Sequence, residues 1–317
     1  MYRDVAAAGV DPLDHYLLQG ASEGRRPQLL LDGDWYRQKN PDVGNMNPLV
    51  HYVRVGRAEG RRIQKRAVVY TAIIGGYDRL RSPVTHDPDL DYIVFADDYL
   101  FPVPPPWIRL KNSLRFVDNR RTSRYFKTHP YSVLPGYDIS VWIDGAFQLR
   151  DLKAEDLEPM LGTADIAFFR HPKRDCTYEE VEAVLRYQLD SPERVDWVVK
   201  QLTAHGYHRH AGLVEAGFIV RRQGAYSLIG AMEEWWQMIL NGSQRDQLSI
   251  NFVLWKHGIQ YAVIPGFSRR NKSVYWMGHR PATWSELDNW ATFLEREILD
   301  LQTAIENRGD GNCECRD

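Results

Sequence analysis

The sequence has few cysteines, no long hydrophobic run and almost no excess of charge. Its three cysteines are Cys176, Cys313 and Cys315, and so sparse and odd a set gives neither a disulfide framework nor the spacing of a zinc site. No apolar run approaches the length that crosses a membrane, and the N-terminus lacks a signal-peptide pattern. The formal net charge of −2 gives no electrostatic reason to expect nucleic acid as a partner. These absences favour a cytoplasmic protein.

The composition is that of a globular protein. The 317 residues are 44% hydrophobic and 26% charged, which suits one large domain or two smaller ones. Aromatic residues are plentiful, with ten tryptophans and seventeen tyrosines. Flat rings stack on the C–H faces of sugars, but a large core uses the same residues. Composition alone therefore leaves sugar binding and core packing as equal explanations.

The start of the chain carries an internal repeat. Residues 11–16 (DPLDHY) recur as 47–52 (NPLVHY), and residues 23–26 recur as 59–62, a period of 36 residues. Each copy opens with proline at a helix start and stops at glycine. A period of this length is typical of small stacked helical units. We therefore expect an all-helical segment over residues 1–64.

Each copy of the repeat carries one histidine, His15 or His51. Two histidines suggest metal ligands, but a single histidine in a helical unit more often packs or forms a hydrogen bond, and we favour that role. Residues 4–5 also resemble residues 42–43, as though the sequence starts within a repeat unit of a longer parent protein.

From residue 65 onward, short apolar runs alternate with amphipathic stretches. Strands are predicted at residues 67–74, 92–96, 141–143, 165–169, 217–220 and 261–264, and helices at 119–128, 179–189, 194–204, 226–240, 246–256 and 284–307. This alternation predicts an α/β fold, in which a mainly parallel, Rossmann-type sheet carries helices on both faces. We assign this domain to residues 65–280, followed by a C-terminal helix and tail over 281–317.

The most informative motif is residues 141–145, an apolar strand that ends on Asp144 and Gly145. Open α/β sheets bind ligands at the carboxyl ends of their strands. A carboxylate there can hold a divalent metal or bond a ribose, and glycine lets a ligand approach the backbone. The alternative is an aspartate that merely starts a turn.

The first strand, which contains Thr71, ends in a second candidate site. Tyr77 is placed to stack on a base, and Asp78 to bond a ribose or to cap the turn. The two glycines at 75–76 do not form the Gly-x-Gly-x-x-Gly fingerprint, so a dinucleotide cofactor is disfavoured.

Three basic residues share one face of the predicted helix at 119–128. Arg120, Arg124 and Lys127 fall within about 60° of one another around the helix axis. Like charges this close repel unless an anion lies between them, which favours a diphosphate as partner. A solvated basic face is the alternative.

Further titratable residues lie beyond the Asp144 strand. His171, Arg174 and Asp175 follow the next strand, at the edge where an acceptor is expected to bind. Glu215 stands just before a later strand. Asp175 has the alternative role of a helix cap.

Two more candidates follow Glu215. Asp246 opens a helix, either as a cap or, if it faces the cleft, as a group that orients or deprotonates an acceptor hydroxyl. His279 follows the last strand and is placed to complete a metal site begun by Asp144.

In combination these motifs resemble a known family. Residues 71–78, 142–145, 171–176, Glu215 and 245–249 are similar to the glycosyltransferase-like domain of plant turgor-regulation-defect and mucilage-related proteins. The resemblance covers about residues 66–280. It implies a GT-A fold, which binds a nucleotide sugar, usually with Mn²⁺ or Mg²⁺ on an Asp-x-Asp motif. Position 146 is alanine, so the second aspartate of that motif is missing.

Two further resemblances complete the interpretation. Asp246 and Gln247 are similar to the Asp-Gln motif of glycogenin-like and lipopolysaccharide galactosyltransferases. The repeats resemble those that accompany catalytic domains in large bacterial surface-polysaccharide glycosyltransferases. Together they imply a bacterial hexosyltransferase of capsule or surface-polysaccharide synthesis, with other modules and the membrane periphery as candidate partners.

The resemblance assigns roles to the candidate residues. The nucleotide-sugar donor, a UDP-sugar by preference, would be bound by Thr71, Tyr77, Asp78, Arg120, Arg124, Lys127, Asp144 and Gly145. The glycan acceptor side would consist of His171, Arg174 and Gln247, and the catalytic groups would be Asp246, Glu215 and Asp175. Asp144 and His279 are the expected ligands of Mn²⁺ or Mg²⁺.

Two other functions compete with a glycosyltransferase. One is a hydrolase of amide or sugar bonds, as a ceramidase-like relative suggests, but the sequence shows no Gly-x-Ser-x-Gly motif and no zinc-ligand cluster. The other is a non-catalytic module that binds a glycan or a nucleotide, in keeping with the missing second aspartate.

Overall fold

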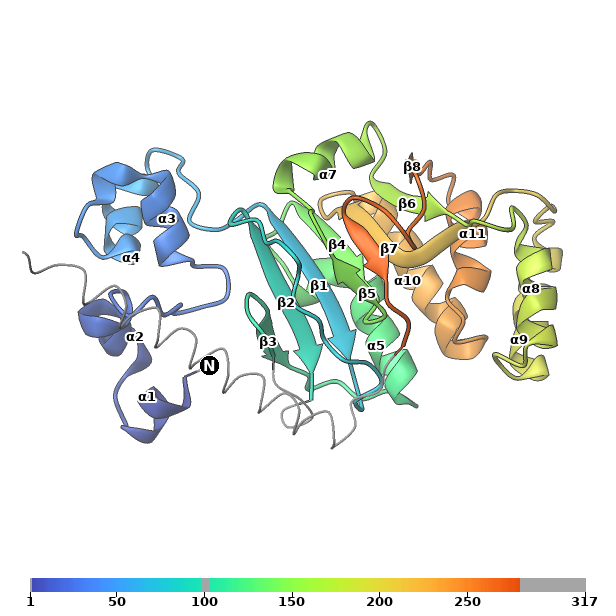
Figure 1. The fold of residues 1–317 in the computed structure, drawn as a ribbon, viewed down its shortest axis with the longest axis horizontal. Helices are drawn as coiled ribbons and strands as arrows, with labels where there is room; N and C mark the ends of the chain where they lie inside the picture. Colours follow the sequence, from blue (N-terminus) through green and yellow to red (C-terminus); the bar gives the residue numbers. More distant parts are fainter. Residues whose placement is uncertain (1, 98–102, 280–317) are drawn as a thin grey trace, which may run out of the picture.

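The computed structural model describes residues 2–97 and 103–279. In this part of the chain a helical segment lies at one end of an α/β domain (Figure 1). The predicted terminal helix at 284–307 and the tail after it lie outside the described residues. Within them, every helix is too short or too polar to cross a membrane.

A seven-stranded sheet forms the centre of the α/β domain. Its order is β3-β2-β1-β4-β7-β6-β8. The strands are β1 (Ala67–Ile73), β2 (Leu90–Ala96), β3 (Ile108–Lys111), β4 (Ile139–Ile143), β6 (Ile166–Arg170), β7 (Val214–Arg222) and β8 (Ala262–Ile264). Only β7 runs antiparallel to its neighbours, β4 and β6. The predicted fold class, a mainly parallel α/β sheet with helices on both faces after a helical segment, is confirmed.

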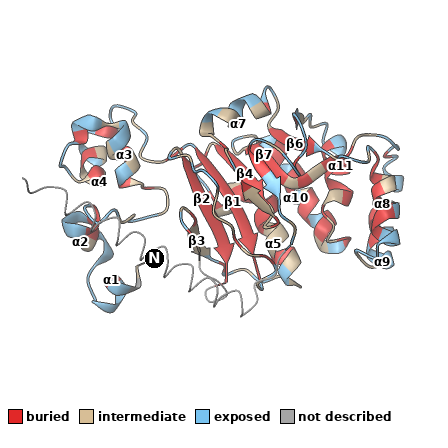
Figure 2. Cartoon of the chain, in the orientation of Figure 1, coloured by how far each residue is buried: buried red, intermediate tan, exposed pale blue. Residues whose placement is uncertain are grey.

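Both faces of the sheet are covered. One face packs on α5 (Asn119–Thr128), α8 (Thr177–Arg186), α9 (Pro192–Ala204), α10 (Tyr226–Asn241) and α11 (Gln247–Lys256). The other face packs on α7 (Ala154–Leu161) and a ribbon of β5 (Phe147–Leu149) with β9 (Val274–Trp276). Side chains of β1 alternate between the two cores, with Tyr70 in one and Val69 in the other. This two-sided burial, visible in Figure 2, explains the continuous apolar runs in the sequence.

Helix α5 brings side chains to the carboxyl edge of the sheet. It starts where Asp118 caps the backbone N–H of Arg121 at 2.7 Å, and it packs on β1. Ser123 donates a hydrogen bond to the carbonyl of Ala72 at 3.0 Å. The short helix α6 (Pro130–Val133) then leads into β4. The first turns of α5 therefore lie beside the ends of β1 and β4.

The helical segment repeats in structure as it does in sequence. Its elements are α1 (Arg3–Ala7), α2 (Pro12–His15), the π-helical turn η1 (Tyr16–Gly20), α3 (Gly33–Lys39), the 3-10 turn η2 (Pro41–Val43), α4 (Pro48–His51) and the π-helical turn η3 (Tyr52–Gly56). Asp11 and Asn47 cap their helices with the same backbone angles, φ −58° and ψ 126°. His51 is buried and bonded to Tyr36, as the packing interpretation expects.

Buried charges fix the helical segment to the sheet. Asp91, at the amino end of β2, is 3% exposed. It accepts a hydrogen bond from Arg26 at 3.0 Å and one from the Tyr137 hydroxyl at 2.8 Å. Lys65 lies 3.2 Å from Asp91 and 3.2 Å from Asp32. The segment is therefore anchored at the edge of the sheet opposite to the carboxyl ends of β1 and β4.

Replacing Asp91 with alanine tests this anchor. Because the substitution leaves Arg26 and Lys65 short of a buried counter-charge, we expect it to lower the free energy of unfolding by about 3–5 kcal/mol. Urea unfolding measures the change. Asp196→Ala, which breaks an exposed pair with Lys200, is the control and should change stability by less than about 0.5 kcal/mol. Equal effects of the two substitutions would contradict the anchoring role.

Candidate functional site

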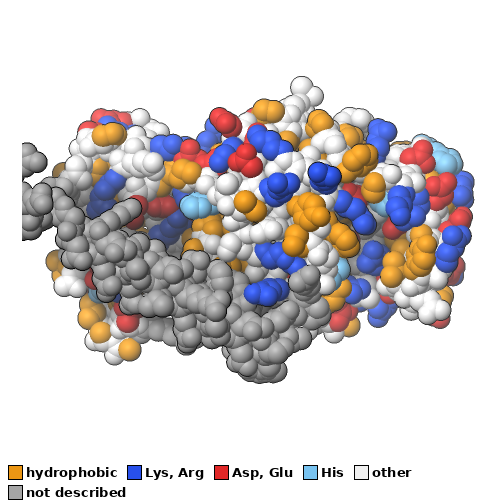
Figure 3. Space-filling view, viewed as in Figure 1, with side chains coloured by type: hydrophobic (Ala, Val, Ile, Leu, Met, Phe, Trp, Pro, Cys, Tyr) orange, Lys and Arg blue, Asp and Glu red, His pale blue; other side chains and the backbone are white. Residues whose placement is uncertain are grey.

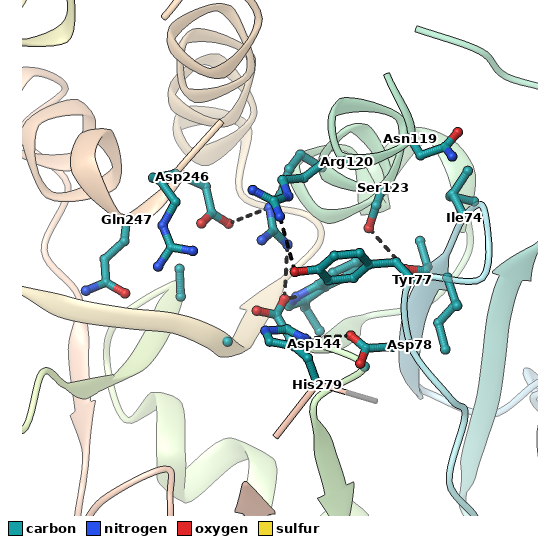
Figure 4. A pocket seen from close by; sticks show the side chains of 18 residues that line it. Ile74, Tyr77, Asp78, Asn119, Arg120, Ser123, Asp144, Asp246, Gln247 and His279 are labelled. Carbon is teal, nitrogen blue, oxygen red and sulfur yellow. Dashed lines mark hydrogen bonds and ion pairs between the residues drawn. The ribbon is translucent and has the colours of Figure 1, made fainter. Parts of the chain in front are cut away.

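A cleft opens where β1 and β4 end. Its cavity measures about 160 Å³ and is lined by residues from β1, α5, the end of β4, β7 and the start of α11. Figure 4 shows side chains from these elements converging on the cavity. This is the edge at which open α/β sheets bind ligands, and it is where the sequence places the donor.

Asp144 lies at the centre of the cleft. Its backbone N–H donates to the carbonyl of Gly217 at 2.8 Å, which fixes the end of β4 against β7. Trp142 donates its indole N–H to Asp144 Oδ1 at 2.6 Å. The same oxygen accepts from Arg124 at 3.2 Å and from Lys127 at 3.3 Å. These three bonds all use Oδ1, so within the described part of the chain Oδ2 is left for a ligand.

Asp246 shares both of these cations. Lys127 is wholly buried and donates to Asp246 Oδ2, and Arg124 Nε lies 3.2 Å from the same carboxylate. We call Arg124, Lys127, Asp144 and Asp246 the ion quartet. Two positive and two negative charges balance within it, which is the condition for keeping ionised groups out of water.

Burial and charge act against each other in the quartet. Burial alone would raise the pKa of Asp144, but Lys127 and Arg124 outweigh it and hold that pKa well below the ordinary aspartate value. Burial lowers the pKa of Lys127 against the pull of the two carboxylates. For Arg124 burial is outweighed by Asp246 and Asp144, which raise the pKa.

The three basic residues of α5 have two different environments. Arg124 and Lys127 are engaged in the quartet, and Lys127 lies beneath the cleft, outside its lining. Arg120 lines the cleft, where it donates to the Tyr77 hydroxyl at 3.1 Å and lies 5.3 Å from that ring's centre. Figure 4 shows the two side chains together at the cavity. Arg120 is therefore the residue of the three with charge to offer a ligand.

Two glycines, Gly75 and Gly145, pack closely against residues that line the cleft. A Cβ atom on Gly145 would come within 2.8 Å of Asp78 Cβ. Gly75 has φ +69°, and a Cβ there would meet the Asn119 amide at 2.0 Å. Any side chain at either position would displace the residue that lines the cavity.

Asp78 and His279 meet at the opposite wall. His279 Nδ1 lies 2.8 Å from Asp78 Oδ2, and its ring centre lies 5.2 Å from that of Tyr77. Both Asp144 and His279 line the cavity. Asp144 and His279 are the expected metal ligands. Their atoms for a cation would be Asp144 Oδ2 and His279 Nε2, since the bonds described above use Asp144 Oδ1 and His279 Nδ1.

Several residues assigned from the sequence lie elsewhere. Thr71 is buried within β1 and does not line the cavity; Ala72 and the residues after it do. The reason is the pleat of β1, which directs Thr71 into the interior. Thr71 therefore lies outside the lining of the cavity that the donor is expected to enter.

Two of the expected acceptor residues, His171 and Arg174, share one carboxylate. Arg174 donates to Glu180 at 2.6 Å, and His171 lies 3.9 Å from the same carboxylate. Burial lowers the pKa of His171. Glu215, next to the lining of the cleft, accepts a hydrogen bond from Ser268, and burial raises its pKa.

Asp175 belongs to a separate group. Asp175, Glu179 and His210 place one ligand atom each within 4.8 Å of one another, and His210 Nδ1 lies 2.8 Å from Asp175. Among the described residues this group has the donor set of a metal site. Asp175 is bonded to His210 and lies outside the lining of the cleft, so it does not join Asp246 there, and its catalytic role stays a prediction.

Sequence reasoning assigned no role to three polar residues that line the cleft, Asn119, Ser123 and Arg245. The first two share a face of α5 with Arg120 and Lys127, so the same helical spacing signals them. Arg245 directly precedes Asp246 and belongs to the 245–249 motif, which assigned roles to Asp246 and Gln247 only. Gln247, assigned to the acceptor, does line the cleft.

Comparison with known proteins identifies the family. Residues 107–267, half of the chain, match the family described as TOD1/MUCI70, glycosyltransferase-like domain. The chain belongs to this family. The resemblance stated from the motifs is thereby confirmed, and membership supports a glycosyltransferase.

Solved structures of glycosyltransferases are distantly similar to the TOD1/MUCI70 chain. One, titled WbbM bifunctional glycosyltransferase apo structure, has 13% identity and a TM-score of 0.40 over 69% of this chain and 46% of that one. Mouse xyloside xylosyltransferase 1, apo form, has 8% identity and a TM-score of 0.34 over 63% and 84%. The chain thus spans less than half of the first structure. No curated protein matches the sequence.

The charge of Asp144 makes stability depend on pH. The pKa of Asp144 is lower in the folded state than its ordinary value of 3.8. Its charge therefore stabilises the fold fully above that value, and the contribution is lost as the pH falls toward the folded pKa. We expect Asp144→Asn to cost about 2–4 kcal/mol at pH 7 and clearly less at pH 3.

Urea unfolding at the two pH values measures this difference. The control is Asp165→Asn, an exposed aspartate 4.0 Å from Arg222, which should change stability little at either pH. A cost for Asp144→Asn that is the same at pH 7 and pH 3 would show that its charge does not matter.

Proposed function

We propose that this chain is a GT-A glycosyltransferase that moves a hexose from a nucleotide-diphosphate sugar to a glycan acceptor. Family membership supports the transferase class. The observation that carries the donor site is the cleft at the ends of β1 and β4, built around Asp144 and its ion quartet. A UDP-sugar is the favoured donor.

The cleft contains side chains suited to the base, the ribose and the diphosphate of the donor. Tyr77 is 47% exposed, and its ring is available to a base. Asp144 Oδ2 and Asp78 are acceptors for the ribose. Arg120 and Arg245, both lining the cavity, are the guanidinium groups that can bond the diphosphate in the bidentate manner.

Departure of the nucleoside diphosphate requires that its growing negative charge be stabilised. Arg120 and Arg245 supply positive charge at the cavity without first releasing a carboxylate of the quartet. Preorganised charge of this kind acts on the transition state because it needs no rearrangement. The quartet itself contributes by holding Asp144 and Asp246 in place.

We assign the acceptor side to Glu215 and Asp246. Burial raises the pKa of Glu215, which brings a carboxylate closer to the working pH of a general base. Asp246 is bonded to Lys127 and is better suited to orient the acceptor. Gln247, His171 and the Arg174–Glu180 pair complete this side.

A divalent cation fits the cleft only together with the donor. Asp144 and His279 offer one ligand atom each, and Mg²⁺ or Mn²⁺ with so few protein ligands completes its shell with substrate phosphates. When bound, the ion would supply positive charge to the leaving diphosphate. The balanced charge of the quartet argues against strong binding of the ion without a nucleotide.

The cellular setting is also a proposal. We place the reaction in the bacterial cytoplasm, in capsule or surface-polysaccharide synthesis, where the helical segment would connect the enzyme to other modules or to the membrane periphery. The support is the resemblance of the repeats to those of bacterial surface-polysaccharide enzymes.

Donor binding is the first test. UDP-, GDP- and CDP-sugars added to the whole chain should raise Tm, because a ligand that binds only the folded state stabilises it. We expect the largest shift with UDP-sugars. Arg120→Ala should weaken binding about tenfold or more through the lost charged contact, whereas Lys200→Ala on α9 should not. The absence of a shift with every nucleotide would contradict the proposal.

Turnover separates an enzyme from a binding module. With a panel of glycan acceptors, Asp144→Asn should reduce transfer by about 100-fold, while it keeps the acceptor for the Trp142 indole. Wild-type binding of the donor without transfer to any acceptor favours the non-catalytic module. Wild-type transfer by Asp144→Asn refutes the role of Asp144.

Metal binding gives a further prediction. In a His210→Ala background, which removes the separate group around Asp175, the affinity for Mn²⁺ should rise at least about tenfold when UDP is present. Electron paramagnetic resonance of free Mn²⁺ measures it. His279→Gln should reduce the effect, and His257→Ala, at an exposed pair with Glu234, should not. Equal affinity with and without UDP speaks against a shared site.

A further inference from the structure

The two repeat units share their ion pairs as well as their backbone conformation. In the second unit Arg61 binds Asp42 at 2.7 Å. In the first unit Arg25 binds Asp4 at the same distance, 2.7 Å. The units are therefore close copies, and a difference between them is informative.

The second unit is built around a tyrosine from the helix that precedes it. Tyr36 of α3 is fully buried. Its hydroxyl lies 3.0 Å from His51 Nδ1, and its ring packs edge-on against Tyr52 at 6.0 Å. A Cβ on Gly56 would come within 2.1 Å of that hydroxyl. Gly56 is thus needed for Tyr36 to fit.

The same place in the first unit is open. Here His15 and Tyr16, the counterparts of His51 and Tyr52, line a cavity of about 220 Å³. Gly20 is the counterpart of Gly56. A Cβ on Gly20 would meet the ring of His15, whereas one on Gly56 would meet the hydroxyl of Tyr36. An apolar cavity of about 150 Å³ holds a benzene ring, so this one has room for an aromatic side chain.

Tyr2 does not fill the cavity. Its hydroxyl accepts the backbone N–H of Arg26 at 2.8 Å, and Arg25 lies 4.9 Å from the centre of its ring. It lines the cavity together with Val5 and Pro12. The tyrosine position of the second unit therefore has no occupant among the described residues.

The apolar surface beside the cavity is also uncovered. In the second unit Leu49 packs onto Tyr16 and Leu31 of the unit before it. Its counterpart Leu13 is 51% exposed, and the neighbouring Val10 is 44% exposed. Leu49 belongs to the surface of the second unit that covers the first. The equivalent surface of the first unit, which contains Leu13, is exposed.

We propose that the first unit is a docking site for a helix of the α3 kind, supplied by a further repeat unit. The occupant brings a tyrosine, whose ring fills the cavity and whose hydroxyl reaches His15, and an apolar surface that covers Leu13. The filled second unit is the template for each of these contacts. The helical segment is then an element of an extendable array, independent of what the donor cleft does.

A graft tests the docking site in the whole chain. Residues 31–46, placed directly before Asp11 instead of residues 1–10, give the first unit a tyrosine at the spacing that separates Tyr36 from Asn47. We expect the graft that carries tyrosine to have a Tm at least about 2–4 °C higher than a graft in which alanine replaces that tyrosine. His15→Ala should shrink this difference, because it removes the partner of the hydroxyl.

Equal Tm values for the tyrosine and alanine grafts, or a difference that His15→Ala leaves unchanged, would overturn the proposal. The unmodified chain supplies a second measurement, which does not depend on how the grafts fold. A peptide of residues 31–46 should bind it at least tenfold more tightly than the same peptide carrying Tyr36→Ala, as measured by fluorescence anisotropy. No binding, or equal binding of the two peptides, counts against the site.

Discussion

Four charged side chains at the end of β4, two of them buried and two half-buried, hold this edge of the α/β domain together. Asp144 belongs to the end of β4, Arg124 and Lys127 to α5, and Asp246 to the start of α11. Each charge has partners on another element, so none can move without leaving a buried charge unpaired. The cleft is in this sense built before any ligand arrives, which is what electrostatic catalysis requires.

The quartet also supplies a second carboxylate near Asp144, although position 146 is alanine. Ala146 is 2% exposed, and its carbonyl accepts the backbone N–H of Met277 at 2.8 Å. The chain thus turns at this point into the β5–β9 ribbon. A carboxylate at this position would be buried against the ribbon. Negative charge near Asp144 comes instead from Asp246, a residue about a hundred positions later.

Much of the fold could be predicted because its signals are local. Helix α5 has the predicted bounds, since its spacing and the cap at Asp118 are readable from neighbouring residues. Asp144 was found because a buried strand ends there. The direction of β7 was not predictable, because the period of a strand is the same in both directions. Three-residue strands such as β5 and β9 are too short to show a period at all.

The site was harder to predict than the fold because its contacts join distant residues. Helical spacing placed Lys127 beside Arg120 correctly, but nothing in the sequence showed that Lys127 is sealed under the cleft by two carboxylates. Asp175 stood beside a strand end like Asp144, yet its partner His210 lies 35 positions away. Burial and partner choice are properties of the folded chain, and spacing does not record them.

The anchor at Asp91 has a mechanical consequence. The helical segment grips the sheet where β2 begins, and the cleft opens where β1 and β4 end (Figure 1). On the face that Figure 3 shows, basic and hydrophobic side chains lie close together over the α/β domain. A force applied to the repeats therefore enters the α/β domain at the amino ends of the strands, away from the cleft. A partner bound to the repeats would thus hold the α/β domain from the end of the sheet opposite to the cleft mouth.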